Sequence, residues 1–139
     1  MYYEDIKIGD SAEFTKTITD EMIRAFAEIS GDMNPVHLDE EIAKKSIFKD
    51  RVAHGILVTG LISAVLGNKL PGQGSIYVSQ SVQFMRPVKI GDEITAKVEV
   101  FEKNDAKGNV KVKTICVNQH GKVVIRGEAV GKPPKKEVS

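Results

Sequence analysis

The sequence contains a single cysteine, no long uninterrupted hydrophobic run and almost no excess of charge of either sign. One cysteine, Cys116, excludes an internal disulfide and any metal site built from several cysteines. The longest apolar run, residues 56–66, is interrupted by small polar residues and is too short to span a membrane. The opening decapeptide MYYEDIKIGD lacks the apolar core of a signal peptide. We therefore expect a cytoplasmic protein in which Cys116 is an inert, partly buried thiol.

The charge balance also excludes a general attraction to polyanions. Twenty basic against nineteen acidic residues give a net charge of +1, so nothing in the composition favours nucleic acid or a membrane surface as a partner. With 139 residues, 41% hydrophobic and 28% charged, the chain is typical of one soluble globular domain. We expect a single domain over residues 1–132 and a disordered tail over residues 133–139.

The first half of the chain shows helical patterning. A helix is predicted to begin at Thr19 or Asp20, which can cap it, and to end at Gly31. A second, short helix is expected over residues 39–45. The stretch HGILVTGLISAVLG, residues 54–67, is apolar almost all the way round, which is typical of a buried helix.

The second half has the period of two that is typical of strands. Alternating segments cover residues 75–84, 93–103, 110–119 and 122–130, with a strand also expected at 11–19. Short turns between the four later segments favour an antiparallel meander. The tetrapeptide KIGD occurs twice, at 7–10 and 89–92, and is interpreted as a reused turn. The pattern predicts an α+β fold in which a curved antiparallel sheet covers one apolar helix.

The segment SGDMNPVHLDEE places an acid and a base on either side of a turn. Asp32 and His37 are five residues apart, and Asn34 and Pro35 between them restrict the backbone. An aspartate is ionised at neutral pH while a histidine is mostly neutral, so a water held between them meets an acceptor and a group that can accept or donate a proton. This chemistry suits the addition of water to an activated double bond.

Two other readings of this segment stay open from the residues alone. Asp32 can be a helix cap and His37 an ordinary loop residue. A metal site built from Asp32, His37 and Asp39 is disfavoured, because the calcium-loop pattern fails and a transition metal would call for more histidines than His54 and His120 supply.

A second group of candidate site residues lies at the start of the apolar helix. Free N–H groups at a helix start can hold a developing negative oxygen, and Gly55 has no side chain to keep a carbonyl away. Equally, Gly55 can be a tight entry turn and His54 a packed core histidine. Ser63, two turns further on, can orient Asp32 if the Asp32 loop crosses the helix, or can bond back to its own helix.

The stretch FAEISGDMNPVHLDEEIA, residues 26–43, resembles the signature of the (R)-specific enoyl-CoA hydratases, the MaoC-like branch of the hot-dog fold. That pattern has an aromatic residue, Ser-Gly-Asp, Asn-Pro, an aliphatic residue, a histidine and a small residue in this order. The stretch matches it at every one of these positions. The likeness continues through HGILVTGLISAVLG, LPGQGSIY and QFMRPVKIGDEIT and covers nearly the whole chain apart from the tail.

The resemblance implies roles for particular residues. Asp32 and His37 would be the acid–base pair and Gly55 the oxyanion donor, with Asn34 and Ser63 in support. We also expect three residues to contact substrate: His54, Leu66 and Arg86. Arg86 would meet the CoA phosphates, although solvated surface charge explains it as well, and Leu66 with its neighbours Leu61 and Val65 would favour short acyl chains.

The implied activity is reversible hydration of trans-2-enoyl-CoA to (3R)-3-hydroxyacyl-CoA, without metal or redox cofactor. The resemblance further implies a homodimer with the thioester tunnel between subunits. A hot-dog acyl-CoA thioesterase, a dehydratase of acyl-carrier-protein thioesters and a non-catalytic acyl-thioester-binding subunit remain alternatives. The absence of a strongly basic face favours CoA over an acidic carrier protein.

Overall fold

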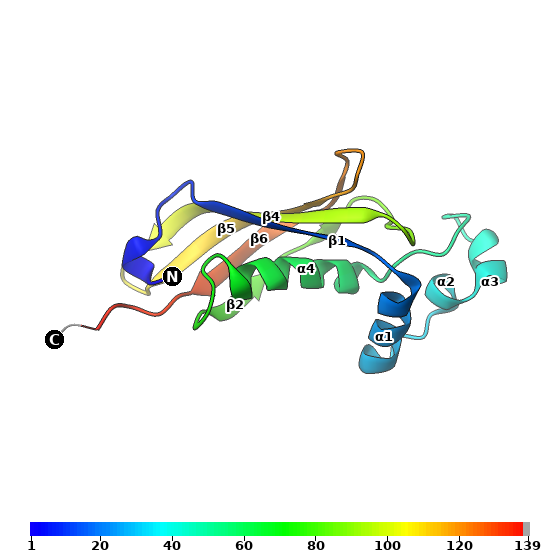
Figure 1. The fold of residues 1–139 in the computed structure, drawn as a ribbon, viewed down its shortest axis with the longest axis horizontal. Helices are drawn as coiled ribbons and strands as arrows, with labels where there is room; N and C mark the ends of the chain where they lie inside the picture. Colours follow the sequence, from blue (N-terminus) through cyan, green and yellow to red (C-terminus); the bar gives the residue numbers. More distant parts are fainter. Residues whose placement is uncertain (138–139) are drawn as a thin grey trace.

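The protein is a six-stranded antiparallel sheet lying over one long helix, as the computed structural model in Figure 1 shows. The structure describes residues 1–137. The strand order is β1-β4-β5-β6-β2, and the short β3 also pairs with β6. The strands are β1 (Ser11–Thr17), β2 (Ile76–Gln80), β3 (Gln83–Phe84), β4 (Glu93–Asn104), β5 (Asn109–Val117) and β6 (Val123–Lys132). The predicted α+β class is confirmed.

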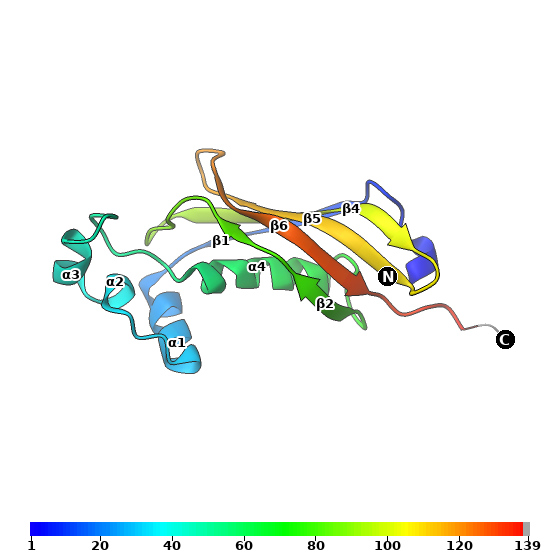
Figure 2. The same cartoon turned by 180° about the vertical axis from the view of Figure 1, so that it is seen from behind.

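The helices divide into one that packs under the sheet and three that lie beyond its end. The long helix is α4 (Gly55–Asn68), and the others are α1 (Asp20–Ser30), α2 (Pro35–Leu38) and α3 (Glu40–Lys44), with a 3-10 turn η1 (Tyr3–Asp5). Both views place α1, α2 and α3 beside the end at which α4 begins, and the N-terminus and the last described residues at the other end (Figures 1 and 2).

The predicted limits of α1 are confirmed, because its caps are those that the sequence supplies. The Thr19 hydroxyl accepts a hydrogen bond from the amide of Met22 at 3.2 Å, and Gly31 ends the helix with φ of +82°. Pro35 starts a separate helical turn, α2, which the sequence did not predict and which contains His37. The acid and the base of the SGDMNPVH segment therefore lie on a loop and on a helical turn.

The core forms between the sheet and one side of α4. The inward positions predicted for β4, from Ile94 to Val100, are buried, as are Val58, Ile62 and Val65 of α4. The expectation of a buried helix holds only for the sheet-facing side of α4 in the single chain. Ile56 keeps 59% of its surface exposed, and Gly60, Ser63 and Gly67 are exposed as well.

The two KIGD segments form the same turn, as predicted. In each, the aspartate side chain accepts a hydrogen bond from the lysine amide, at 2.8 Å in residues 7–10 and 2.9 Å in residues 89–92. Their glycines have φ of +94° and +93°, a region that favours glycine. The turns lead into β1 and β4, and β1 pairs over its whole length with residues 93–99 of β4.

The prediction of a four-stranded meander is wrong in one respect. Only β4, β5 and β6 form a meander, while the segment 75–84 breaks into β2 and β3 and pairs with β6 at the far edge. The break is possible because Gly127 of β6 has no side chain. A Cβ there would lie 1.8 Å from the carbonyl oxygen of Ser81, where β2 gives way to β3.

Three further expectations concern the termini and Cys116. Cys116 is buried, and burial raises the pKa of its thiol to about 12, which keeps it protonated. Of the tail predicted to be disordered, residues 133–137 are described, with the Pro134 carbonyl accepting from the Tyr3 amide at 2.8 Å, while 138–139 lie outside the described residues. Within residues 1–137, no helix is both long and apolar enough to cross a bilayer.

Candidate active site

The loop that carries Asp32 is shaped by hydrogen bonds from its own neighbours. The Asp32 amide donates to the hydroxyl of Ser30 at 3.1 Å, and the Asp32 carboxylate accepts from the amide of Asn34 at 3.2 Å. The side chain of Asn34 in turn caps α2 by accepting from Val36 at 3.2 Å. These local contacts orient the Asp32 side chain in a loop that is itself exposed.

His37 is held through one ring nitrogen, which leaves the other free. Its Nδ1 lies 2.8 Å from the carbonyl oxygen of Val52 and must carry the hydrogen, because a carbonyl can only accept. The lone pair is therefore on Nε2. Arg51 adds a second restraint by donating from Nε to the main-chain carbonyl of His37 at 2.7 Å.

The extended segment from Arg51 to Gly55 organises the whole site. Val52 orients the His37 ring, and two residues later His54 donates from Nε2 to the main-chain carbonyl of Asp32 at 3.0 Å. Gly55 follows as the first residue of α4, so its N–H has no acceptor within the helix. One short segment thus contacts the acid loop and the base, and ends at a free amide.

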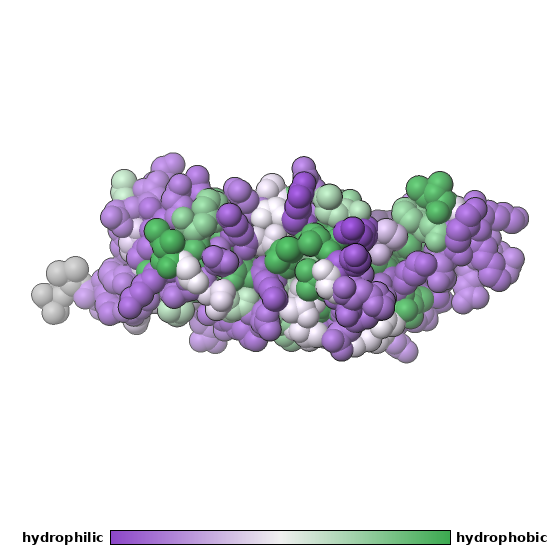
Figure 3. All heavy atoms as spheres, turned by 90° about the horizontal axis from the view of Figure 1, so that it is seen from above, coloured by the Kyte–Doolittle hydropathy of each residue, from purple (hydrophilic) through white to green (hydrophobic). Residues whose placement is uncertain are grey.

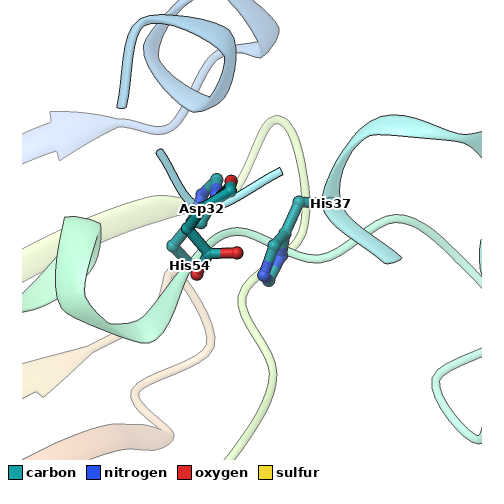
Figure 4. A group of neighbouring side chains, drawn as sticks. All are labelled: Asp32, His37 and His54. Atoms are coloured by element: carbon teal, nitrogen blue, oxygen red, sulfur yellow. Dashed lines mark hydrogen bonds between the residues drawn. The ribbon is translucent and has the colours of Figure 1, made fainter. Parts of the chain in front are cut away.

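Asp32, His37 and His54 gather between the end of α1, the α2 turn and the start of α4 (Figure 4). Each offers an oxygen or nitrogen atom, and these atoms all lie within 4.8 Å of one another. A water that accepts or donates two hydrogen bonds of ordinary length joins groups roughly 4.5 Å apart. The Asp32 and His37 atoms, at most 4.8 Å apart, are therefore within reach of a shared water.

The same three side chains do not suit a metal ion. An imidazole coordinates in its ring plane, at about 2.0–2.1 Å for zinc. The rings of His37 and His54 are stacked, with centroids 3.9 Å apart and planes 28° apart, so their in-plane lone pairs do not converge on one ion. The arrangement fits acid–base chemistry better than metal chemistry.

A cavity of about 430 Å³ opens beside His37 and the start of α4. Its polar lining comes from Asn34, His37 and Arg86, and Gly55 contributes to the wall. The rest is apolar: Val36, Phe48, Val52, Ala53, Ile56, Val58, Phe84, Met85, Pro87, Val88 and Ile125. A mostly apolar cavity with a few polar groups at one place is typical of a site for a small organic ligand.

Most of the other residues predicted for the site lie away from the cavity lining. Ser63 is two turns along α4, about 12 Å from Gly55, and lines a separate cavity of about 440 Å³ between α4 and β2. Leu66 is buried at 4% exposure further along α4. Neither His54 nor Asp32 is among the residues that line the cavity, but Asp32 is exposed beside it, whereas the His54 side chain is buried at 2% exposure. Arg86 lies at the cavity, with Nη1 donating to the Val123 carbonyl at 2.7 Å.

Two residues important to the site's geometry were not predicted. The Phe84 ring lies against Gly55, where a Cβ would come 2.5 Å from it. Arg51 is 6% exposed and forms an ion pair with Asp20 at the start of α1. Hydrogen bonds from Arg24 and Arg51 hold the pKa of the Asp20 carboxyl below its usual value. Arg51 closes the charged triplet Lys49-Asp50-Arg51, which gave no signal that this one charge would be buried.

A larger hollow of the surface lies away from these residues. It measures about 1020 Å³ and is lined largely by outward-facing side chains of β4, β5 and β6, among them Lys97, Glu99, Lys113 and Glu128. Figure 3, which looks onto this side of the sheet, shows mostly hydrophilic side chains with small apolar islands. Because its charges alternate along the strands and none of the predicted site residues lies there, we place the site at the smaller cavity.

Comparison with known proteins gives consistent similarities. A model of the MaoC like domain family matches residues 5–121. An (R)-specific enoyl-CoA hydratase of Rhodospirillum rubrum is 52% identical over 128 residues, covering 92% of this chain and 88% of that protein. A 3-hydroxybutyryl-CoA dehydratase of Methylorubrum extorquens is 44% identical over 137 residues, covering 99% and 87%. The solved structure of an (R)-hydratase from A. caviae involved in PHA biosynthesis superposes with a TM-score of 0.91 at 40% identity, covering 94% and 99%. The hot-dog fold expected from the sequence is confirmed.

Proposed function

The chain belongs to the family of MaoC-like domains, and from this premise we propose that it is an (R)-specific enoyl-CoA hydratase. It is a hydro-lyase that interconverts trans-2-enoyl-CoA and (3R)-3-hydroxyacyl-CoA. The observation that carries the proposal is the placement of Asp32 and His37 within 4.8 Å of each other, next to a cavity that also contains Gly55.

The proposed mechanism uses each of these groups once. The Gly55 N–H donates a hydrogen bond to the thioester oxygen, which draws electrons away from C3 of the enoyl group. Water held between Asp32 and His37 attacks C3 while one of the pair takes its proton. That same proton is then delivered to C2 on the same face through Asp32, which is ionised until it receives the proton from the water or from His37. The hydroxyl and the hydrogen added to the double bond both come from that water.

Incubation of the purified protein with crotonyl-CoA tests this function directly. We expect the absorbance of the conjugated double bond to fall and chiral chromatography to find the (3R) product, without release of free thiol. Release of thiol with the double bond intact would instead identify a thioesterase, and binding without turnover an acyl-thioester-binding subunit. Faster turnover of the crotonyl carrier-protein thioester would reassign the substrate class.

We further propose that the protein acts as a homodimer. The exposed side of α4 adjoins β2, an edge strand on which Ile76 is 61% and Val78 51% exposed. A large apolar patch beside an open sheet edge is typical of an interface, because pairing two such edges buries both. A cytoplasmic location, one domain over residues 1–132, and the support of Asp32 by Ser63 stay predictions.

Gly60→Leu tests the homodimer. Apart from the neighbouring backbone of α4 itself, no heavy atom of residues 1–137 lies within 4 Å of the position that a Cβ would take at Gly60, so the single chain tolerates a side chain there. In a dimer that packs on this side of α4, a leucine would displace the second copy. We expect light scattering to show monomers for Gly60→Leu and dimers for wild type and for the control Lys113→Leu, on the outer face of the sheet. A dimeric Gly60→Leu variant would contradict this interface.

A further inference from the structure

We propose that His54 is a positioning residue, which fixes Asp32 and His37 relative to the amide of Gly55 without touching substrate. This inference rests on the proposed hydratase function and extends it to a side chain behind the cavity wall. His54 contacts both members of the acid–base pair, and the peptide bond to Gly55 joins it to the oxyanion donor.

The first contact ties the acid to the start of α4. Residues 31–35 are all exposed, so few packing contacts restrain the loop that carries Asp32. The hydrogen bond from His54 Nε2 to the main-chain carbonyl of Asp32, at 3.0 Å, joins this loop to the residue that caps α4. Without that donor the carbonyl would turn to solvent, and the carboxylate would move with it.

The second contact supports the base. The His54 ring stacks on His37 with centroids 3.9 Å apart, and Phe26 packs against His54 at 4.8 Å with its ring tilted by 60°. The His54 ring is thus a buried platform, 2% exposed, on which the partly exposed His37 ring rests. Together with the bond from His37 to the Val52 carbonyl, the stack directs His37 Nε2.

The environment of His54 also separates its role from that of His37. Its Nδ1 is buried and has no hydrogen-bond partner among residues 1–137, while its Nε2 faces a carbonyl. A hydrogen on Nδ1 would have no acceptor, so the geometry favours the Nε2–H tautomer. His54 therefore serves as a fixed donor and platform, and proton transfer stays with Asp32 and His37.

His54→Phe and His54→Gln separate the donor from the ring. Phenylalanine keeps the platform and removes the N–H, whereas glutamine keeps an N–H at a similar reach and removes the ring. For crotonyl-CoA hydration, we expect His54→Phe to lower kcat on the order of 10- to 100-fold, the usual cost of losing a group that orients a functional residue. KM should stay within about twofold, since no ligand contact is lost. His54→Gln should recover most of the lost kcat.

Two further measurements accompany the kinetics. Melting temperatures show whether each variant is folded at the assay temperature, and nitrogen-15 spectra of the wild type should show a protected Nε2–H on His54. The inference is overturned if folded His54→Phe keeps kcat near wild type, if its loss of activity only follows a loss of folded protein, or if His54→Gln is no better than His54→Phe. Failure of the wild type to hydrate crotonyl-CoA would overturn the proposed function instead, while the spectrum would still report the hydrogen bond.

Discussion

Asp32→Asn and His37→Gln are each expected to lower kcat for crotonyl-CoA hydration by roughly 10²- to 10⁴-fold, the usual contribution of a general acid or base. Asparagine at position 32 can still accept the hydrogen bond from the Asn34 amide, so the loop should keep its shape. It cannot take or deliver a proton. The measurement is the loss of crotonyl-CoA absorbance at saturating substrate, with folding checked by circular dichroism.

The chain offers a matched control for each change. Asp39→Asn alters a nearby carboxylate that caps α3, a task that asparagine performs as well. His120→Gln alters an exposed histidine in the turn between β5 and β6. Both should keep full activity. Because Asp32 and His37 are expected to act on one water, the double variant should lose no more than the worse single one. A folded single variant with near wild-type turnover would show that the pair is not catalytic.

Gly127→Ala is expected to have the largest effect on stability. Its new Cβ would lie 1.8 Å from the Ser81 carbonyl oxygen and 2.6 Å from the Ser81 carbonyl carbon, and backbone atoms cannot swing aside as a side chain can. The chain would have to separate β2 and β3 from β6. We expect a loss of about 3 kcal/mol or more in the free energy of unfolding, at or beyond the upper end of overpacking costs.

Urea denaturation, or soluble yield if the variant does not fold, measures this effect. Gly131→Ala is the matched control in the same strand, since its Cβ would meet the Pro71 ring at 3.2 Å and the Ile76 carbonyl oxygen only at 3.9 Å, an ordinary contact distance. A clearly smaller loss is expected there. Equal losses at the two positions would mean that the approach of Ser81 to β6 is not what requires glycine. The contact also matters for function, because β3 carries Phe84 to the wall of the cavity beside Gly55.

Features that depend on neighbours in the chain could be predicted from the sequence. The caps of α1, the two KIGD turns and the inward side of β4 each follow from side chains within a few residues of the backbone they shape. The same holds for the Asp32 loop, where Ser30 and Asn34 make the bonds. The acid and the base could be found because five residues and a proline limit how far apart they can lie.

The contact with substrate that was expected for His54 illustrates the limit of prediction from neighbouring residues in the sequence. That contact was expected alongside the roles that the resemblance implies, while the residues alone left a packed core histidine equally open. The structure buries it beneath His37, against a loop 22 residues earlier in the chain. Arg51 is a similar case, since it reaches Asp20 across 31 residues. No local pattern encodes these partners.

Local chemistry in the chain was therefore enough to specify the turns, the caps, the apolar helix and the acid–imidazole loop, because short-range hydrogen bonds and side-chain alternation act within a few residues. The pairing of β2 and β3 with β6, the placement of Phe84 on Gly55 and the stacking of His54 on His37 arose only once distant segments packed together. Those contacts depend on the close fit of surfaces formed by residues that are far apart in the sequence. No periodic pattern of residue types in the sequence predicts such a fit.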